Sequence, residues 1–296
     1  METSTSNIAT AQGERRQLLP DDLRLGAVHL KVSDLDRSVS FYCEILGLQL
    51  NVGEDDTAWL GAGGENLIVL HEVPGAHAVS GHSGLYHAAI LYPSRLELAR
   101  VAQRISVTNT PIQGASDHGI SEAIYLPDPD GNGIELAADQ PRESWPDLSD
   151  ITAIAPSPLD MGGLFNLVSG REAELVADPL TQIGHVHLHV GDIAEGLAFY
   201  RELVGFDLVT YVDMAAFVSA GGYHHHLAFN TWQGVGAPPS PPEAAGLLHW
   251  NVVLPSNGDV EAVAARLVAG GYETTDVEAG FEVRDPWQNA LRVVCD

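Results

Sequence analysis

The chain is poor in cysteine, in basic residues and in long apolar runs, and each shortage excludes a class of protein. Its 296 residues include two cysteines without a Cys-x-x-Cys pattern, which excludes a disulfide framework. Fourteen Lys and Arg against 40 Asp and Glu give a formal net charge of −26, which argues against nucleic acid and anionic membranes as partners. No apolar run of about 18 residues occurs, and no secretory leader is recognisable. We therefore expect a cytoplasmic protein, with a polar tail at residues 1–20.

A strand–helix–strand pattern begins four times along the chain. Residues 25–48 first alternate apolar and polar side chains, and then place apolar residues three and four positions apart. The segment 183–206 matches 25–48 at ten of 24 positions, which indicates an internal duplication. Similar units begin at Gly84 and Gly246. The predicted fold class is α+β, with four βαβββ units paired into two domains, 21–140 and 181–296, and a proline-interrupted linker, 141–180, with a short helix near 163–169.

The segment from Asp117 to Glu135 concentrates chemically active side chains around one turn. Its run 128–133, DPDGNG, contains residues that fix φ near −65° or permit positive φ, so it should link two strands. In the second strand, Glu135 alternates with Ile134 and Leu136 and so faces away from the apolar side. A carboxylate in that position becomes a candidate site residue if other polar groups converge on it.

Two histidines occupy equivalent positions of the repeat. His29 and His87 lie in the first strands of units one and two, each on the face opposite the apolar one. If helices cover one side of each sheet, both histidines and Glu135 face a cup between two paired units. Two imidazoles and one carboxylate on one side of a metal leave neighbouring positions open, as in non-haem Fe(II) oxygenases. A single histidine of this kind is more often structural, but its repetition favours a metal site.

The four-unit duplication resembles the vicinal oxygen chelate superfamily, which includes glyoxalase I, fosfomycin- and bleomycin-resistance proteins and extradiol ring-cleaving dioxygenases. The whole chain is similar to a two-domain bacterial branch of catechol 2,3-dioxygenases. Ser116 departs from the extradiol signature, which has another small or β-branched residue there. The spacing that resembles this signature is His118-x5-Ile124-Tyr125-x2-Asp128-Pro129-x-Gly131-x3-Glu135.

The resemblance implies a role for each residue of this constellation. His29, His87 and Glu135 would be the metal ligands. His118 would hydrogen-bond or protonate the dioxygen or the substrate, and Tyr125 would hold a substrate hydroxyl. The implied metal is Fe(II), with Mn(II) as an alternative, and the implied reactants are a small aromatic diol and O₂. A homo-oligomer is compatible with the resemblance.

One departure concerns the location of the metal. Two-domain extradiol dioxygenases usually keep it in the C-terminal domain, where this chain has Arg292 in place of the glutamate. That domain is rich in histidine, and strand alternation leaves His187, His226 and His249 as an alternative hypothesis, a three-histidine site. Strand alternation directs His225 to the helix side, although its position resembles the acid–base histidine of classical-size extradiol enzymes.

Two other functions compete with the dioxygenase. A glyoxalase-type isomerase or thiol transferase usually takes one metal ligand from each of four strands, but the fourth strand of unit one supplies Asn66, Ile68 and Leu70. The missing fourth ligand favours redox chemistry. A metal-free module that sequesters a small aromatic compound would bind its ligand regardless of chelators. Because this architecture supports many reactions, the fold alone does not decide among them.

Overall fold

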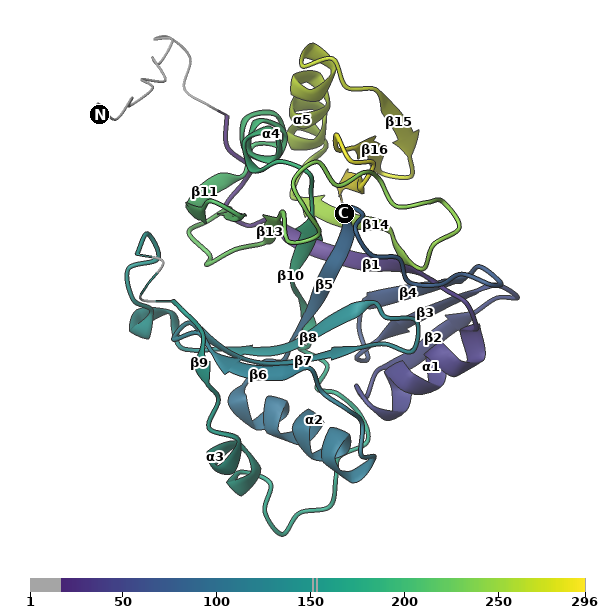
Figure 1. The fold of residues 1–296 in the computed structure, drawn as a ribbon, viewed down its shortest axis with the longest axis vertical. Coiled ribbons are helices and arrows are strands. Elements are labelled where there is room, and N and C mark those ends of the chain that lie inside the picture. The colour runs from purple at the N-terminus through teal and green to yellow at the C-terminus, as the bar shows by residue number, and fades with distance from the viewer. Residues whose placement is uncertain (1–16, 151, 153, 296) are drawn as a thin grey trace.

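The computed structural model describes residues 17–150, 152 and 154–295, and it consists of four successive βαβββ modules (Figure 1). Most of the tail predicted at residues 1–20 lies outside the described residues. The predicted α+β fold class is confirmed. Module one contains β1 Arg24–Val32, α1 Leu35–Glu44, β2 Gln49–Gly53, β3 Thr57–Gly61 and β4 Asn66–Glu72. Module two contains β5 Gly84–Leu91, α2 Arg95–Val107, β6 Gly114–Asp117, β7 Ser121–Pro127 and β8 Gly133–Asp139.

The second half of the chain repeats this order after a connecting segment. The connection holds η1 Arg142–Ser144, β9 Ser157–Pro158 and α3 Met161–Asn166, so its helix begins slightly before the predicted position. Module three contains β10 Gln182–His189, α4 Ile193–Gly196, the π-helical turn η2 Leu197–Val204, β11 Asp207–Val212, β12 Ala215–Ser219 and β13 Leu227–Asn230. Module four contains β14 Gly246–Leu254, α5 Asn257–Ala269, β15 Thr274–Val277, β16 Gly280–Arg284 and β17 Ala290–Cys295.

The local signals in the sequence account for the ends of the helices. Asp34 caps α1 by accepting a hydrogen bond from the backbone N–H of Arg37, and Ser94 caps α2 in the same way. Gly47 follows α1 with φ at +78°, a left-handed conformation that costs glycine little. Each first strand is therefore followed at once by a helix that folds back onto its sheet.

The four modules form two sheets that do not follow the order of the chain. One sheet has the order β15-β16-β17-β14-β1-β4-β3-β2, and the other has the order β11-β12-β13-β10-β5-β8-β7-β6-β9. Module one therefore shares a sheet with module four, through β1 and β14, and module two shares one with module three, through β5 and β10. The sequence predicted a cup between modules one and two. This prediction is wrong, because module two pairs with module three. Strand alternation could not reveal this, because it fixes the face of each side chain but not the neighbour of each strand.

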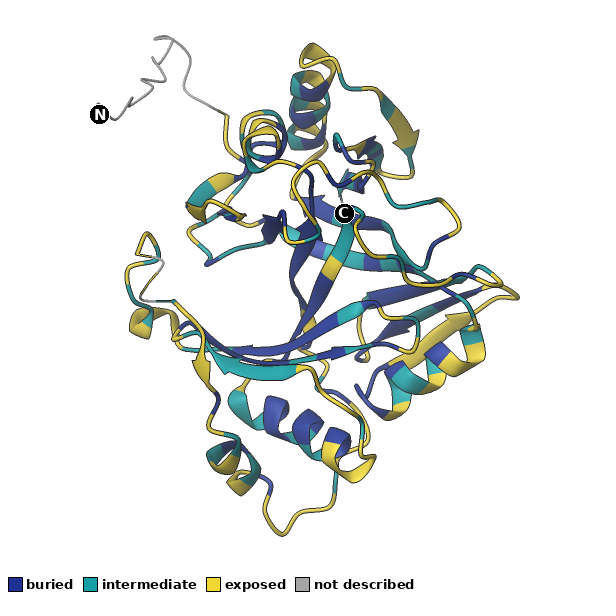
Figure 2. Cartoon of the chain, viewed as in Figure 1, coloured by how far each residue is buried: buried dark blue, intermediate teal, exposed yellow. Residues whose placement is uncertain are grey.

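The helices pack on the outer faces of the sheets, and the buried core lies beneath them (Figures 1 and 2). In β10, the core-facing Val186 and Leu188 are fully buried and alternate with the histidines of the opposite face. The same alternation in β1 buries Val28, Leu30 and Val32. Among the described residues, no helix has the length and apolar character needed to cross a membrane.

Candidate metal centre

Three adjacent strands of the sheet of modules two and three bring together two histidines and a glutamate. His87 comes from β5, Glu135 from β8 and His185 from β10. Ala89 of β5 is paired with Glu135 on one side and with His185 on the other, and His87 lies two residues before it on the same face. Because Ala89 has only a methyl group, the three longer side chains can meet above it.

A β-bulge adjusts the strand that holds His87. Across β5 and β10, His87 is opposite His187 and Leu85 is opposite Leu188, so Tyr86 is an additional residue in β5. Its ring lies 4.8 Å from that of His87 and 5.0 Å from that of His187, between centroids. A bulge re-aims neighbouring side chains, and here it directs both Tyr86 and His87 into the cup.

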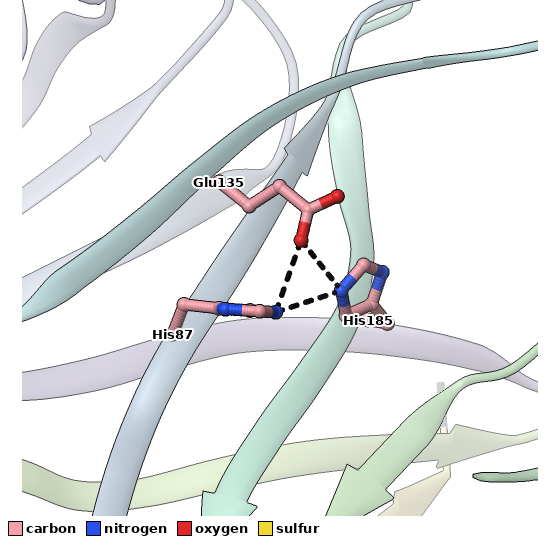
Figure 3. Close-up of side chains that lie close together, drawn as sticks. All are labelled: His87, Glu135 and His185. Carbon is pink, nitrogen blue, oxygen red and sulfur yellow. Dashed lines mark hydrogen bonds and ion pairs between the residues drawn. The ribbon is translucent and has the colours of Figure 1, made fainter. Parts of the chain in front are cut away.

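The donor atoms of the three residues form an almost equilateral triangle (Figure 3). The Nε2 atoms of His87 and His185 are 3.1 Å apart, and Oε2 of Glu135 lies 3.0 Å from the first and 3.2 Å from the second. Metal–ligand bonds of about 2.1 Å at right angles place donor atoms about 3.0 Å apart. Within the described part of the chain, this is the one group of three or more such side chains with the spacing of metal ligands. The geometry therefore fits one face of an octahedral metal.

The electrostatics of the group also suit a cation. Burial alone would raise the pKa of the Glu135 carboxyl, but His185 and His87 hold it well below its usual value. Burial lowers the pKa of His87, although Glu135 opposes this effect. At neutral pH the carboxylate is thus ionised and the His87 ring neutral, which are the forms that bind metals. The ionised carboxylate gives the group a buried negative charge, which a divalent cation can neutralise.

Tyr125 and His118 lie beside the metal group. Tyr125 is opposite Glu135 across β7 and β8, and its ring lies 5.8 Å from that of His87 between centroids. His118 follows β6, and its Nε2 lies 2.9 Å from the Tyr125 hydroxyl. Burial, and then the charge of Glu135, raise the pKa of Tyr125 far above its usual value, so its hydroxyl remains a proton donor. The structure therefore brings four sequence-predicted residues together: His87, His118, Tyr125 and Glu135.

The structure places His29 elsewhere. It belongs to β1 in the other sheet, where its ring stacks on His249 at 3.8 Å between centroids and its Nδ1 lies 2.9 Å from Nε2 of His71. Its position in the metal group is taken by His185, because β10 and not β1 is the neighbour of β5. His29, His87 and Glu135 thus do not converge as the resemblance implied.

The alternative three-histidine site does not assemble either. His187 lies beside the metal group, but its Nε2 is 2.8 Å from Nδ2 of Asn230, which donates to it. Nδ1 of His226 lies 3.0 Å from the hydroxyl of Ser219, and His249 belongs to the other sheet. The three histidines are therefore held by separate partners.

Comparison with known proteins identifies the family. The model of the Glyoxalase/Bleomycin resistance protein/Dioxygenase superfamily matches residues 24–136 and 182–293, which is most of the chain. The chain belongs to this superfamily. The resemblance to this superfamily, inferred from the four-unit duplication, is thus confirmed.

The superfamily relatives include a dioxygenase with substantial identity. The chain is 42% identical over 276 residues to a catechol-2,3-dioxygenase of Bacillus subtilis, and the match covers 91% of this chain and 96% of the relative. Among solved structures, a putative dioxygenase of Bacillus subtilis is similar with a TM-score of 0.62 and 15% identity, covering 92% of this chain and 86% of the other. Glyoxalase I of Zea mays is similar with a TM-score of 0.59 and 19% identity, and the match covers 93% of this chain and 92% of the other. The two structural likenesses concern the fold alone.

A hydrogen-bonded chain of side chains ends at the metal group. Nε2 of His224 lies 3.0 Å from Oδ1 of Asp139, and its Nδ1 lies 2.8 Å from Nδ1 of His225. The His225 ring packs on His185 with 4.1 Å between centroids. If His224 donates to the carboxylate, it accepts from His225, whose Nε2 is then left as an acceptor. The expectation that His225 faces the helices is therefore corrected: it lies in the cup.

His185 is the ligand candidate that the sequence did not predict, and His225 is a residue that it assigned to the wrong face. The internal repeat aligns His29 with His187, and it therefore indicated His187 and not His185 as the site residue of β10. His225 was misplaced because alternation was extended from β13, whereas residues 221–226 precede that strand and do not share its alternation. In both cases the useful signal was the density of histidines in module three, and only the strand neighbours could sort them.

Gly133 offers a test of the bulge. A Cβ atom at this position would overlap with the carbonyl oxygen of Tyr86, the bulged residue. We expect Gly133→Ala to displace His87 and to weaken metal binding by at least about tenfold, the lower end of the effect of disturbing groups around a metal. Gly114→Ala is the matched control, because a Cβ atom there meets no atom within 4 Å. Equal metal affinity in the two variants, measured by titration with a fluorescent chelator, would show that the bulge does not position His87.

Proposed function

We propose that the protein is an extradiol dioxygenase that uses Fe(II) and O₂ to open the ring of catechol-type diols. The convergence of His87, Glu135 and His185 on one metal face is the observation on which this proposal rests. The catechol-2,3-dioxygenase relative, 42% identical over most of the chain, supports the choice of reaction and substrate class. The reaction adds both oxygen atoms of O₂ and breaks the carbon–carbon bond beside one hydroxyl-bearing carbon, which yields an aldehyde and a carboxylic acid.

His87, His185 and Glu135 would hold Fe(II), which when bound would supply the redox chemistry that O₂ requires. Other residues of this chain manage substrate binding and protons beside these three side chains. His225 is suited to take a proton from a diol hydroxyl at its Nε2, since burial and then His185 lower its pKa well below the usual value and keep it neutral. The hydroxyl of Tyr125 is positioned by His118 and is suited to donate a hydrogen bond to a substrate oxygen.

The proposal can be tested with three isomers of one substrate. Protein loaded with Fe(II) without oxygen is mixed with catechol, resorcinol or hydroquinone, and oxygen uptake is then followed. We expect one O₂ per catechol and a yellow product, and no uptake with resorcinol or hydroquinone, because only catechol has neighbouring hydroxyls. Tight metal binding without oxygen uptake on catechol or its ring-substituted forms would instead favour a glyoxalase-type enzyme. Stoichiometric binding of catechol that a chelator does not affect would favour a binding module.

His225 should affect the chemical step but not metal binding. We expect His225→Gln to lower kcat by about 10²–10⁴-fold, the usual contribution of a positioned acid–base group. The metal content should stay at that of the unmodified protein, because His225 is outside the group of three donors. His77→Gln, at an exposed position, is the control. A parallel loss of metal in His225→Gln would assign this residue a role in holding the metal.

A further inference from the structure

The sheet of modules one and four contains a second cup with the same strand arrangement as the metal centre. His249 is paired with His29 across β14 and β1, as His87 is paired with His187 across β5 and β10. Arg292 of β17 is paired with Asn251, two residues after His249. In the metal centre, Glu135 is paired in the same way with the residue two positions after His87.

The second cup has only one of the three metal ligands. His249 corresponds to His87, but Arg292 stands where the metal centre has Glu135, and at the repeat offset of 158 residues Ala27 corresponds to His185. A guanidinium group replaces a carboxylate at the floor of the cup. The charge required of a ligand is therefore reversed, and an anion is favoured in place of a cation.

Arg292 has donors available for such an anion. Its Nε donates to Oε2 of Glu282 at 3.0 Å, and Oε1 of the same carboxylate accepts from Arg284 at 3.1 Å. Two guanidinium groups thus share one carboxylate, which leaves one excess positive charge in a strongly acidic protein. Only Nε of Arg292 has a protein acceptor among the described residues, and about a third of its side chain is exposed. Its two terminal nitrogen atoms have the planar geometry that binds a carboxylate with two hydrogen bonds.

Two buried polar atoms beside Arg292 lack partners. Nε2 of His249 and Oδ1 of Asn251 form no hydrogen bond within the described part of the chain. His249 is only 3% exposed, and its ring is held in the cup by stacking on His29. A buried polar atom without a partner costs about 1–3 kcal/mol. Both residues lie on the same face of β14, two positions apart. A hydroxyl can donate to a carbonyl oxygen such as Oδ1 while it accepts from a protonated ring nitrogen such as Nε2.

We propose that this second cup binds a small hydroxycarboxylate anion. The carboxylate pairs with Arg292, and the hydroxyl lies between His249 and Asn251. The site is distinct from the dioxygenase centre and does not depend on its chemistry. A monoanion matches the single excess positive charge better than a dianion such as phosphate, which the net charge of −26 disfavours further.

Calorimetric titration of the metal-loaded protein with salicylate tests this proposal. We expect one salicylate to bind per chain. Arg292→Gln should lower the affinity for salicylate at least tenfold, and Arg292→Lys, which keeps the positive charge, should lower it less. Benzoate, which lacks the hydroxyl, should bind several-fold more weakly than salicylate. Arg171→Gln, which makes the same change of charge at an exposed residue of the linker, is the control.

The other outcomes contradict the proposal. Because salicylate can also chelate metals, the titration is repeated with His185→Ala. Binding lost in His185→Ala and kept in Arg292→Gln would place the ligand at the metal centre. The proposal would also be overturned if salicylate does not bind, or if Arg171→Gln weakens salicylate binding as much as Arg292→Gln does. Tighter binding of inorganic phosphate than of salicylate would contradict it too. Oxygen uptake with catechol is measured on each variant, so that failure of the dioxygenase proposal is recognised separately.

Discussion

His185→Ala should remove both the bound metal and the dioxygenase activity. Its Nε2 is one corner of the donor triangle, 3.1 Å from His87 and 3.2 Å from Glu135, and the side chain is only 5% exposed. Residues that only hydrogen-bond to metal ligands already contribute about 10–100-fold to metal affinity. Loss of a ligand itself should therefore lower the metal affinity by more than about 100-fold. Metal content after gel filtration and kcat/KM for oxygen uptake are the measurements.

His29→Ala is the control that separates the two sheets. It removes an imidazole that the sequence resemblance implied as a ligand, but the structure stacks this ring on His249 in the other sheet. We expect full metal content and near-normal activity, with circular dichroism to confirm folding. If His29→Ala loses the metal while His185→Ala retains it, the pairing of module two with module three is not the arrangement that forms the site.

Glu135→Gln should be almost as damaging, although it hardly changes the shape of the side chain. The amide lacks the negative charge that compensates a divalent cation between two neutral imidazoles, and one of its ends is a donor that repels a metal. We expect metal affinity to fall by more than about 100-fold and oxygen uptake to become undetectable. Glu282→Gln, in the other sheet, changes the net charge equally and should retain both.

A metal titration of the two glutamine variants distinguishes a ligand from a structural acid. Equal metal content in Glu135→Gln and in the unmodified protein would remove this carboxylate from the ligand set. The Asp117–Glu135 signature would then serve the fold and not the metal. Loss of the metal from a variant that remains folded would instead identify Glu135 as a ligand, because a buried acid with a purely structural role would affect folding first.

The metal centre draws its side chains from both halves of the chain. His87 and Glu135 come from the first half, whereas His185 and His225 come from the second half. The two sequence units, 21–140 and 181–296, each contribute one module to each sheet. Neither unit alone contains all three donor atoms, so the metal centre requires both halves of the chain to be folded together.

The sequence alone determined the local structure and half of the site. The repeat at residues 25–48 and 183–206 identified the modules because each must bury one apolar strand face under its own helix. The turn at 128–133 placed Tyr125 opposite Glu135, since the two strands of a hairpin are neighbours by necessity. His118 and Tyr125 came together for the same reason, because they are only seven positions apart in the sequence.

Only the tertiary structure decided which modules meet, and with them the third side chain of the candidate metal centre. Pairing β5 with β10 or with β1 leaves every side chain on the face that alternation assigns to it, so both arrangements fit the sequence equally well. The bulge at Tyr86 and the course of residues 221–226 likewise depend on packing between distant segments. Contacts within a module follow from periodicity, whereas His185 joins His87 and Glu135 through a strand pair about a hundred residues apart, which no local pattern encodes.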